Sequence, residues 1–223
     1  MEAGRRMDRA RIWRKRRRGQ RAAAALALLV FGAVVPLPAL GPVPAAAQFS
    51  DAFNFLKAVR DRDVLKARSF LEKPGSTVIN ARDLDSGDTA LHIVTKRRDA
   101  PWMAFLLQSG ADPNARDRAG ETPLMVAART GFADGVRLMI AVNAQVDAAN
   151  PRGETPLMIA VLNRDAAVAR LLLEAGADPD RPDNATGLSA REHAARDPRA
   201  GPVGRLLAEA PKRTARAVAG PQL

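Results

Sequence analysis

The chain has 223 residues, of which 47% are hydrophobic and 26% charged, and it contains no Cys and no Tyr. This composition supports a sizeable core and excludes a chain that is disordered throughout. It also excludes a disulfide framework, a thiol nucleophile and Cys-ligated zinc, and with two histidines it leaves few acid–base groups. The formal net charge of +11 suggests a nucleic-acid binder, but the distribution of that charge argues against one.

The first 47 residues have the three-part pattern of a secretory signal peptide. Residues 1–21 carry ten basic and two acidic side chains, so they hold eight of the eleven net charges, and residues 22–47 carry none. The apolar run 22–35 is too short to span a membrane comfortably, and Ala45 and Ala47 are the small residues that a signal peptidase accepts. We therefore expect cleavage after Ala47 and a periplasmic or secreted bacterial protein.

Other interpretations of this segment stay open. Residues 22–47 form 26 uncharged positions, so an uncleaved anchor in the inner membrane is the main alternative. The basic run Arg14–Arg18 could instead be a nucleic-acid arm or an import signal. The export route is undecided. If the segment is cleaved, we expect no stable membrane insertion and no nucleic-acid partner, because the remaining chain has a net charge of only +3.

The remaining chain contains an internal repeat with a period of 33 residues. Gly87-Asp88-Thr89-Ala90-Leu91-His92 recurs at residues 120–125 as Gly-Glu-Thr-Pro-Leu-Met and again at residues 153–158. Residues 106–113 match residues 172–179 in the same register, 66 positions later. Repetition at such a period is typical of solenoids, in which each unit stacks on its neighbours.

This pattern resembles the ankyrin repeat family. The resemblance implies an all-α solenoid of stacked helix-turn-helix pairs joined by β-turn or hairpin loops, with about five repeats including caps. The domain would span residues 48–210, with repeats at roughly 49–82, 84–116, 117–149, 150–182 and 183–210. Residues 211–223 would form a disordered tail.

Single residues indicate where the helices begin and end. Thr122 and Thr155 are expected to cap first helices, and Asp99 and Asp165 second helices. Arg98 and Arg164 stand where the family has an inter-helix Gly, which costs free energy if φ is positive there. Gly135 lies inside a second helix and predicts that repeat 118–149 is the softest. Residues 201–204, Gly-Pro-Val-Gly, are interpreted as a turn.

The sequence predicts no catalytic, cofactor or metal site. His92 and His193 lie about three repeats apart and cannot share a metal or a catalytic triad. In the family, an imidazole at the position of His92 usually bonds the backbone of adjacent repeats. We expect the same structural role here.

The family resemblance implies a protein partner, unidentified, that is bound by hairpin tips and exposed first-helix residues on the concave face. The alternatives are a membrane-tethered scaffold and a secreted effector. The candidate contact residues are Asp85, Ser86, Asp88, Lys96, Arg97, Arg118, Glu121, Arg129, Thr130, Arg152, Glu154, Leu162 and Asn163.

Overall fold

The computed structural model describes residues 45–211, with side chains from residue 51 onward. The predicted signal peptide up to residue 44 and the predicted tail from residue 212 lie outside the described residues. Helix α2 begins at Ala45, so the predicted cleavage site after Ala47 falls in its first turn. Within the described part, no helix combines the length and the apolar character needed to cross a membrane.

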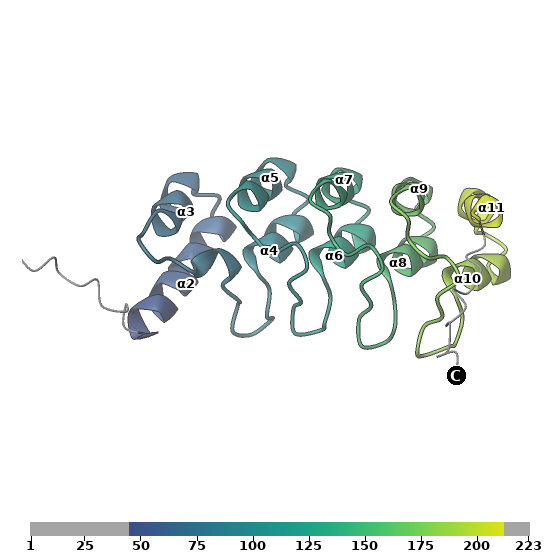
Figure 1. Ribbon diagram of the computed structural model, residues 1–223, viewed down its shortest axis with the longest axis horizontal. Helices are drawn as coiled ribbons and strands as arrows, with labels where there is room; N and C mark the ends of the chain where they lie inside the picture. The colour runs from purple at the N-terminus through teal and green to yellow at the C-terminus, as the bar shows by residue number, and fades with distance from the viewer. Residues whose placement is uncertain (1–44, 212–223) are drawn as a thin grey trace, which may run out of the picture. The chain divides into compact units, whose positions relative to one another are not determined.

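Ten α-helices form two layers in this part of the chain (Figure 1). The inner layer, beside the loops, consists of α2 (Ala45–Arg60), α4 (Ala90–Lys96), α6 (Pro123–Arg129), α8 (Pro156–Leu162) and α10 (Ala190–Arg196). The outer layer consists of α3 (Val64–Leu71), α5 (Ala100–Gln108), α7 (Ala133–Ala141), α9 (Ala166–Glu174) and α11 (Gly201–Glu209). A short 3-10 turn, η1 (Val78–Asn80), leads into the first hairpin. The expected all-α solenoid with five stacked helix pairs is confirmed.

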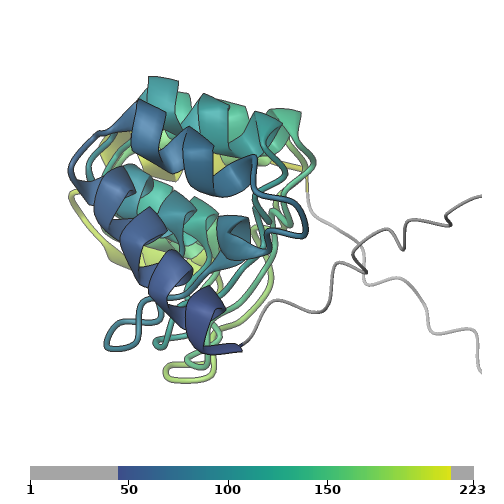
Figure 2. The ribbon, with the colours of Figure 1, turned by 90° about the vertical axis from the view of Figure 1, so that its left-hand side faces the viewer.

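The pairs repeat one arrangement along the stack. Each inner helix packs on the outer helix that follows it and on the neighbouring inner helices. Seen along the stack, the pairs lie behind one another and all the hairpin loops leave on the same side (Figure 2). The described residues contain no strand, only isolated bridges within the first and last hairpins, Arg82 to Thr89 and Pro182 to Ser189.

Capping residues set the helix starts, as the sequence predicts. The Thr122 hydroxyl accepts the Met125 N–H at 3.4 Å, and the next residue, Pro123, occupies the first turn of α6. The Asp99 carboxylate accepts the Trp102 N–H at 3.3 Å at the start of α5. These side chains satisfy amide groups that a helix leaves without partners.

The core repeats with the helices. Leu91, Leu124 and Leu157 occupy one register of the inner layer and are fully buried, as are Leu106 and Leu172 in the outer layer. Small residues such as Ala127 let the two layers approach closely. Burial of the same positions in successive repeats makes each pair dependent on its neighbours.

Neighbouring hairpins touch through backbone. The Arg118 N–H donates to the Ser86 carbonyl at 3.0 Å, and the Asn184 N–H donates to the Arg152 carbonyl at 2.8 Å. Pro151 holds the corresponding place in the third hairpin, and because proline has no N–H, that rung is missing. Gly153 is required here, since a Cβ at its φ of +78° would lie 2.6 Å from the Asn184 nitrogen.

Candidate protein-binding site

The accessible surface of the inner layer is narrow. In α4, α6 and α8 the only residue classed as exposed is the last one: Lys96, Arg129 and Leu162, respectively. Helices α2 and α10 also end in exposed residues, Arg60 and Arg196. We call these five residues, which follow one another from repeat to repeat, the inner row.

Three cations of the inner row form ion pairs with hairpin carboxylates. The Lys96 ammonium lies 2.8 Å from both carboxylate oxygens of Asp88. Arg129 pairs with Oε1 of Glu121, and Arg60 pairs with Oδ2 of Asp83. The Lys96 side chain is 48% exposed and that of Asp88 11%; for Arg129 and Glu121 the values are 42% and 15%. In these pairs the cations are therefore more exposed to solvent than the carboxylates behind them.

The hairpin backbone keeps the carboxylate of Asp83, the partner of Arg60, ionised. The N–H of Ser86 and the Arg60 guanidinium hold the pKa of Asp83 well below its usual range. The Asp83 carboxylate also accepts the Asp85 N–H at 3.0 Å. The hairpin conformation and the position of Arg60 are thus fixed by the same side chain.

The inner row changes character at Leu162. This side chain is 51% exposed, and no cation replaces it. Glu154, the hairpin acid of the same repeat, pairs instead with Arg152 at 2.9 Å and accepts the Asn150 amide at 2.7 Å. The neighbouring Asn163 donates to the Arg129 carbonyl at 3.0 Å. The result is an apolar contact point between two cationic ones.

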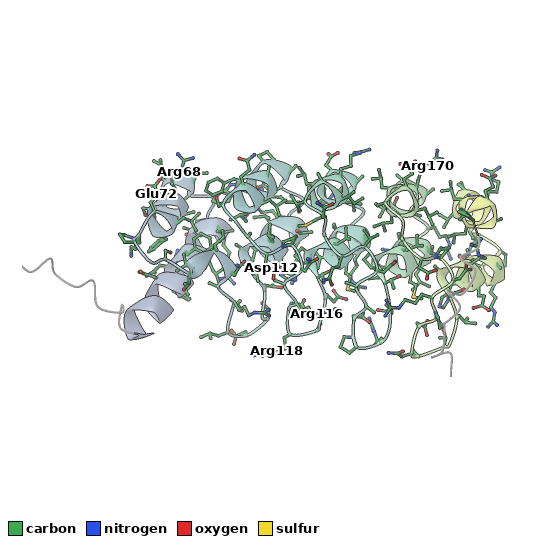
Figure 3. All side chains as sticks on the ribbon, in the orientation of Figure 1. Arg68, Glu72, Asp112, Arg116, Arg118 and Arg170 are labelled. Atoms are coloured by element: carbon green, nitrogen blue, oxygen red, sulfur yellow. The ribbon has the colours of Figure 1, made fainter. Side chains whose placement is uncertain are left out.

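The hairpin candidates lie at the loop side of the stack. Figure 3 shows Arg116 and Arg118 there, far from Arg68 and Arg170 on the outer helices. The Arg118 guanidinium donates to the Leu84 carbonyl at 2.6 Å. Asp85 is exposed and Ser86 half-buried. The hydroxyl of Thr130, at the end of α6, donates to the Val126 carbonyl at 2.9 Å.

Asp88 and Arg97, both candidate contact residues, are largely enclosed by the stack. The Asp88 carboxylate is buried beneath Lys96. Arg97 donates to the Val59 carbonyl at 2.9 Å and lies 3.2 Å from Asp99, so it joins the first two helix pairs. Both side chains are engaged in the fold itself.

His92 links successive repeats. Its Nδ1 accepts the Thr89 N–H at 3.2 Å, which completes the cap of α4, and its Nε2 donates to the Glu121 carbonyl of the next hairpin at 3.0 Å. The side chain is fully buried. Burial lowers the pKa of His92, which favours the neutral ring. The expected bond to backbone of an adjacent repeat is confirmed.

Comparison with known proteins agrees with this geometry. Residues 91–183, from α4 to the last hairpin, match the family model of ankyrin repeats in three copies. The described stack is an ankyrin-repeat solenoid. The chain is also 39% identical over 79 residues to oxysterol-binding protein homolog 1 of Saccharomyces cerevisiae; this match covers 34% of the chain and 6% of the yeast protein. The chain therefore spans only a small part of that relative's length. Ankyrin repeats generally mediate protein–protein interaction.

The second histidine of the ankyrin stack does not form a catalytic relay. His193 Nε2 lies 2.9 Å from Asp183 Oδ2 and 3.4 Å from the Thr186 hydroxyl. A triad base would hold its carboxylate on one nitrogen and its nucleophile on the other. The His193 imidazole and the N–H of Thr186 hold the pKa of Asp183 well below its usual range. No group of His, Cys, Asp and Glu in the described residues could hold a metal.

A groove beside the first ankyrin hairpin escaped the sequence analysis. It has a volume of about 580 Å³ and lies between α2 and the hairpin, with Phe53 and Leu84 among its lining residues. Leu84 is 79% exposed. Leu84 follows Asp83 in the first hairpin, and Arg118 follows Asp117 at the equivalent position of the second. In later repeats the residue at this position faces the preceding hairpin. Because α2 replaces a preceding hairpin, Leu84 has no such neighbour; a leucine at a position that holds Arg118, Pro151 and Asn184 in the later repeats was the available signal.

Proposed function

We propose that this chain is an exported bacterial ankyrin-repeat protein that binds a partner protein through its inner row and its hairpin tips, without catalysing a reaction. The observation that carries the proposal is the inner row itself. Each inner helix adds one exposed terminal side chain at the same place, on a surface that the stacked core already holds in position. A preformed surface lowers the ordering cost of binding.

Affinity capture from a periplasmic extract tests this function. The chain from Gln48 to the end would serve as bait, beside variants Arg129→Gln and Leu162→Ser. The matched control is Arg137→Gln, since Arg137 is an exposed arginine of outer helix α7 that pairs with Asp134 on its own helix. We expect the bait and the control to retain the same protein and the inner-row variants to lose it. Failure to recover any protein reproducibly would contradict the function.

Export is the second part of the proposal. Cleavage after Ala47 would remove three residues of α2, while among the side chains that the structure describes, from residue 51 onward, the first core residues of that helix are Phe55 and Leu56. The stack can therefore tolerate the cut. N-terminal sequencing of the protein from the periplasm should find Gln48 first. An intact N-terminus in the membrane fraction would support the tethered scaffold instead, and recovery from the culture medium would support a secreted effector.

A further inference from the structure

The two helix layers differ in the charge of their last turns. Four of the five inner helices, α2, α4, α6 and α10, carry a basic residue there and α8 does not, whereas among the five outer helices only α3 carries one, Arg68. A cation near a helix C-terminus is favourable because it complements the helix dipole. That benefit is available to both layers, so it does not explain why the cations gather in one.

The inner row also has a regular spacing. Packed helices lie about 8–10 Å apart, and an extended chain rises about 3.3 Å per residue. Three residues of an extended ligand therefore span one repeat. Along the row the ligand would meet cations at Lys96 and Arg129, an apolar side chain at Leu162 and a cation again at Arg196.

We propose that the inner row binds an extended acidic segment of a partner protein. Every third residue of this segment would meet one position of the row. Carboxylates would meet Lys96, Arg129 and Arg196, and an apolar side chain between the last two carboxylates would lie on Leu162. This inference rests on the proposed function and specifies the chemistry of the partner. The low exposure of the Asp88 and Glu121 side chains keeps these hairpin carboxylates behind the cations, where they repel an acidic ligand less than fully exposed carboxylates would.

A protein ligand fits this row better than a nucleic acid. The five residues of the inner row include no aromatic ring on which a base could stack. An exposed leucine between cations offers nothing to a phosphate backbone but suits an apolar side chain. Binding of nucleic acid is therefore the competing outcome of the test.

Fluorescence anisotropy with synthetic peptides tests the inference. The labelled probe would carry Glu, Glu, Leu and Glu at every third residue, separated by Ser and Gln, and a second probe would have the reverse order. We expect at least one probe to bind the chain from Gln48 onward. Lys96→Gln and Arg129→Gln should each weaken that binding about tenfold, and Arg137→Gln should leave it within about twofold. Replacing the peptide's Leu with Ser should weaken binding severalfold.

Three results would overturn the inference: neither probe binds, the Leu-to-Ser peptide binds equally well, or a single-stranded oligonucleotide binds more tightly than both probes. Circular dichroism of each variant verifies that it is folded. If capture from extract still identifies a partner that Arg129→Gln loses while the probes do not bind, the proposed function stands and only the acidic chemistry fails.

Discussion

His92 is the residue whose chemistry is most completely used by the fold. One ring nitrogen caps α4 and the other reaches the next hairpin, and Met125 and Met158 occupy the same register in the following repeats. At this register the first complete repeat is thus tied to its neighbour by a buried side-chain hydrogen bond, whereas the next two repeats have the apolar side chain of methionine there.

We expect His92→Ala to lower the free energy of unfolding by about 2–3 kcal/mol, because it leaves the Thr89 N–H and the Glu121 carbonyl without their partner and opens a cavity. Urea denaturation followed by circular dichroism measures the change. The exposed outer-helix substitution Gln108→Ala should alter stability by less than about 0.5 kcal/mol. Equal stability of the two variants would contradict the structural role of His92.

The lowered pKa of His92 makes stability depend on pH. Above about pH 6.5, the ordinary value, the ring is neutral in both states and its contribution is complete. Below that pH the unfolded chain takes up the proton more readily, so the free energy of unfolding falls as pH falls toward the folded-state pKa. Denaturation curves between about pH 7 and pH 5 should show this loss in the natural chain and less of it in His92→Gln, which keeps a capping side chain without titrating.

Two arginines show how far residue-level prediction extends. Arg98 and Arg164 have φ of 57° and 58°, so the condition under which the sequence analysis expects them to cost free energy is met. The sequence did not show the side-chain contacts that accompany this backbone conformation. Arg98 donates to the Gly131 carbonyl at 3.3 Å, and Arg164 pairs with Asp197 at 2.7 Å. Those partners lie 33 residues away, and only the exact stacking of repeats brings them into reach.

At the scale of the helix, Gly135 has a packing role that its sequence position concealed. The sequence predicted a soft repeat because glycine weakens a helix. In the structure a Cβ at Gly135 would lie 2.3 Å from the ring of Phe132, which is itself buried. The glycine therefore makes room for a core aromatic at the start of α7.

Gly135→Ala should consequently destabilise the protein by about 1–3 kcal/mol through overpacking, despite the better helix propensity of alanine. Gly204→Ala in α11 is the matched control, since its Cβ would lie at an ordinary 3.4 Å from Ala200. That substitution should stabilise by about 0.5–1 kcal/mol. Thermal unfolding of both variants checks the prediction; a gain at Gly135 would show that Phe132 moves freely.

The interpretation of residues 201–204 as a turn was wrong. They form the beginning of α11, with Pro202 in its first turn. Glycine and proline are common in turns, but proline is equally at home at the start of a helix because the first amides have no intrahelical partner. Composition alone could not separate these two uses.

At the scale of the whole stack, contacts between hairpins are expected to contribute to cohesion. Gly153→Ala and Gly187→Ala compare a hairpin that has a following neighbour with the last described hairpin. Both glycines have positive φ, but only Gly153 would place a Cβ against the next hairpin. We expect a cost of about 1 kcal/mol at Gly187 from backbone strain and about 2–3 kcal/mol at Gly153, where a clash is added.

Chemical denaturation of the two variants gives this difference directly. Hydrogen exchange at the Asn184 amide should also become faster in Gly153→Ala, since its bond to the Arg152 carbonyl would be disturbed. Equal costs at the two positions would mean that the hairpins do not support one another.

The 33-residue period predicted the stack because repeated burial of Leu91, Leu124 and Leu157 requires neighbours of the same shape. It also placed Lys96, Arg129 and Leu162 in equivalent positions. Which charged side chains face solvent could not be predicted, because the enclosure of Asp88 and Arg97 depends on contacts between elements. The groove at Leu84 depends on α2 taking the place of a hairpin.

Site-specific photocrosslinking in living cells tests most directly whether the inner row is the binding surface. A photoreactive phenylalanine analogue would replace Leu162 in one strain and Val142 in another; Val142 is a comparably exposed residue at the end of outer helix α7. We predict a discrete crosslinked protein from position 162 and none from position 142. Crosslinking from position 142 alone would contradict the account.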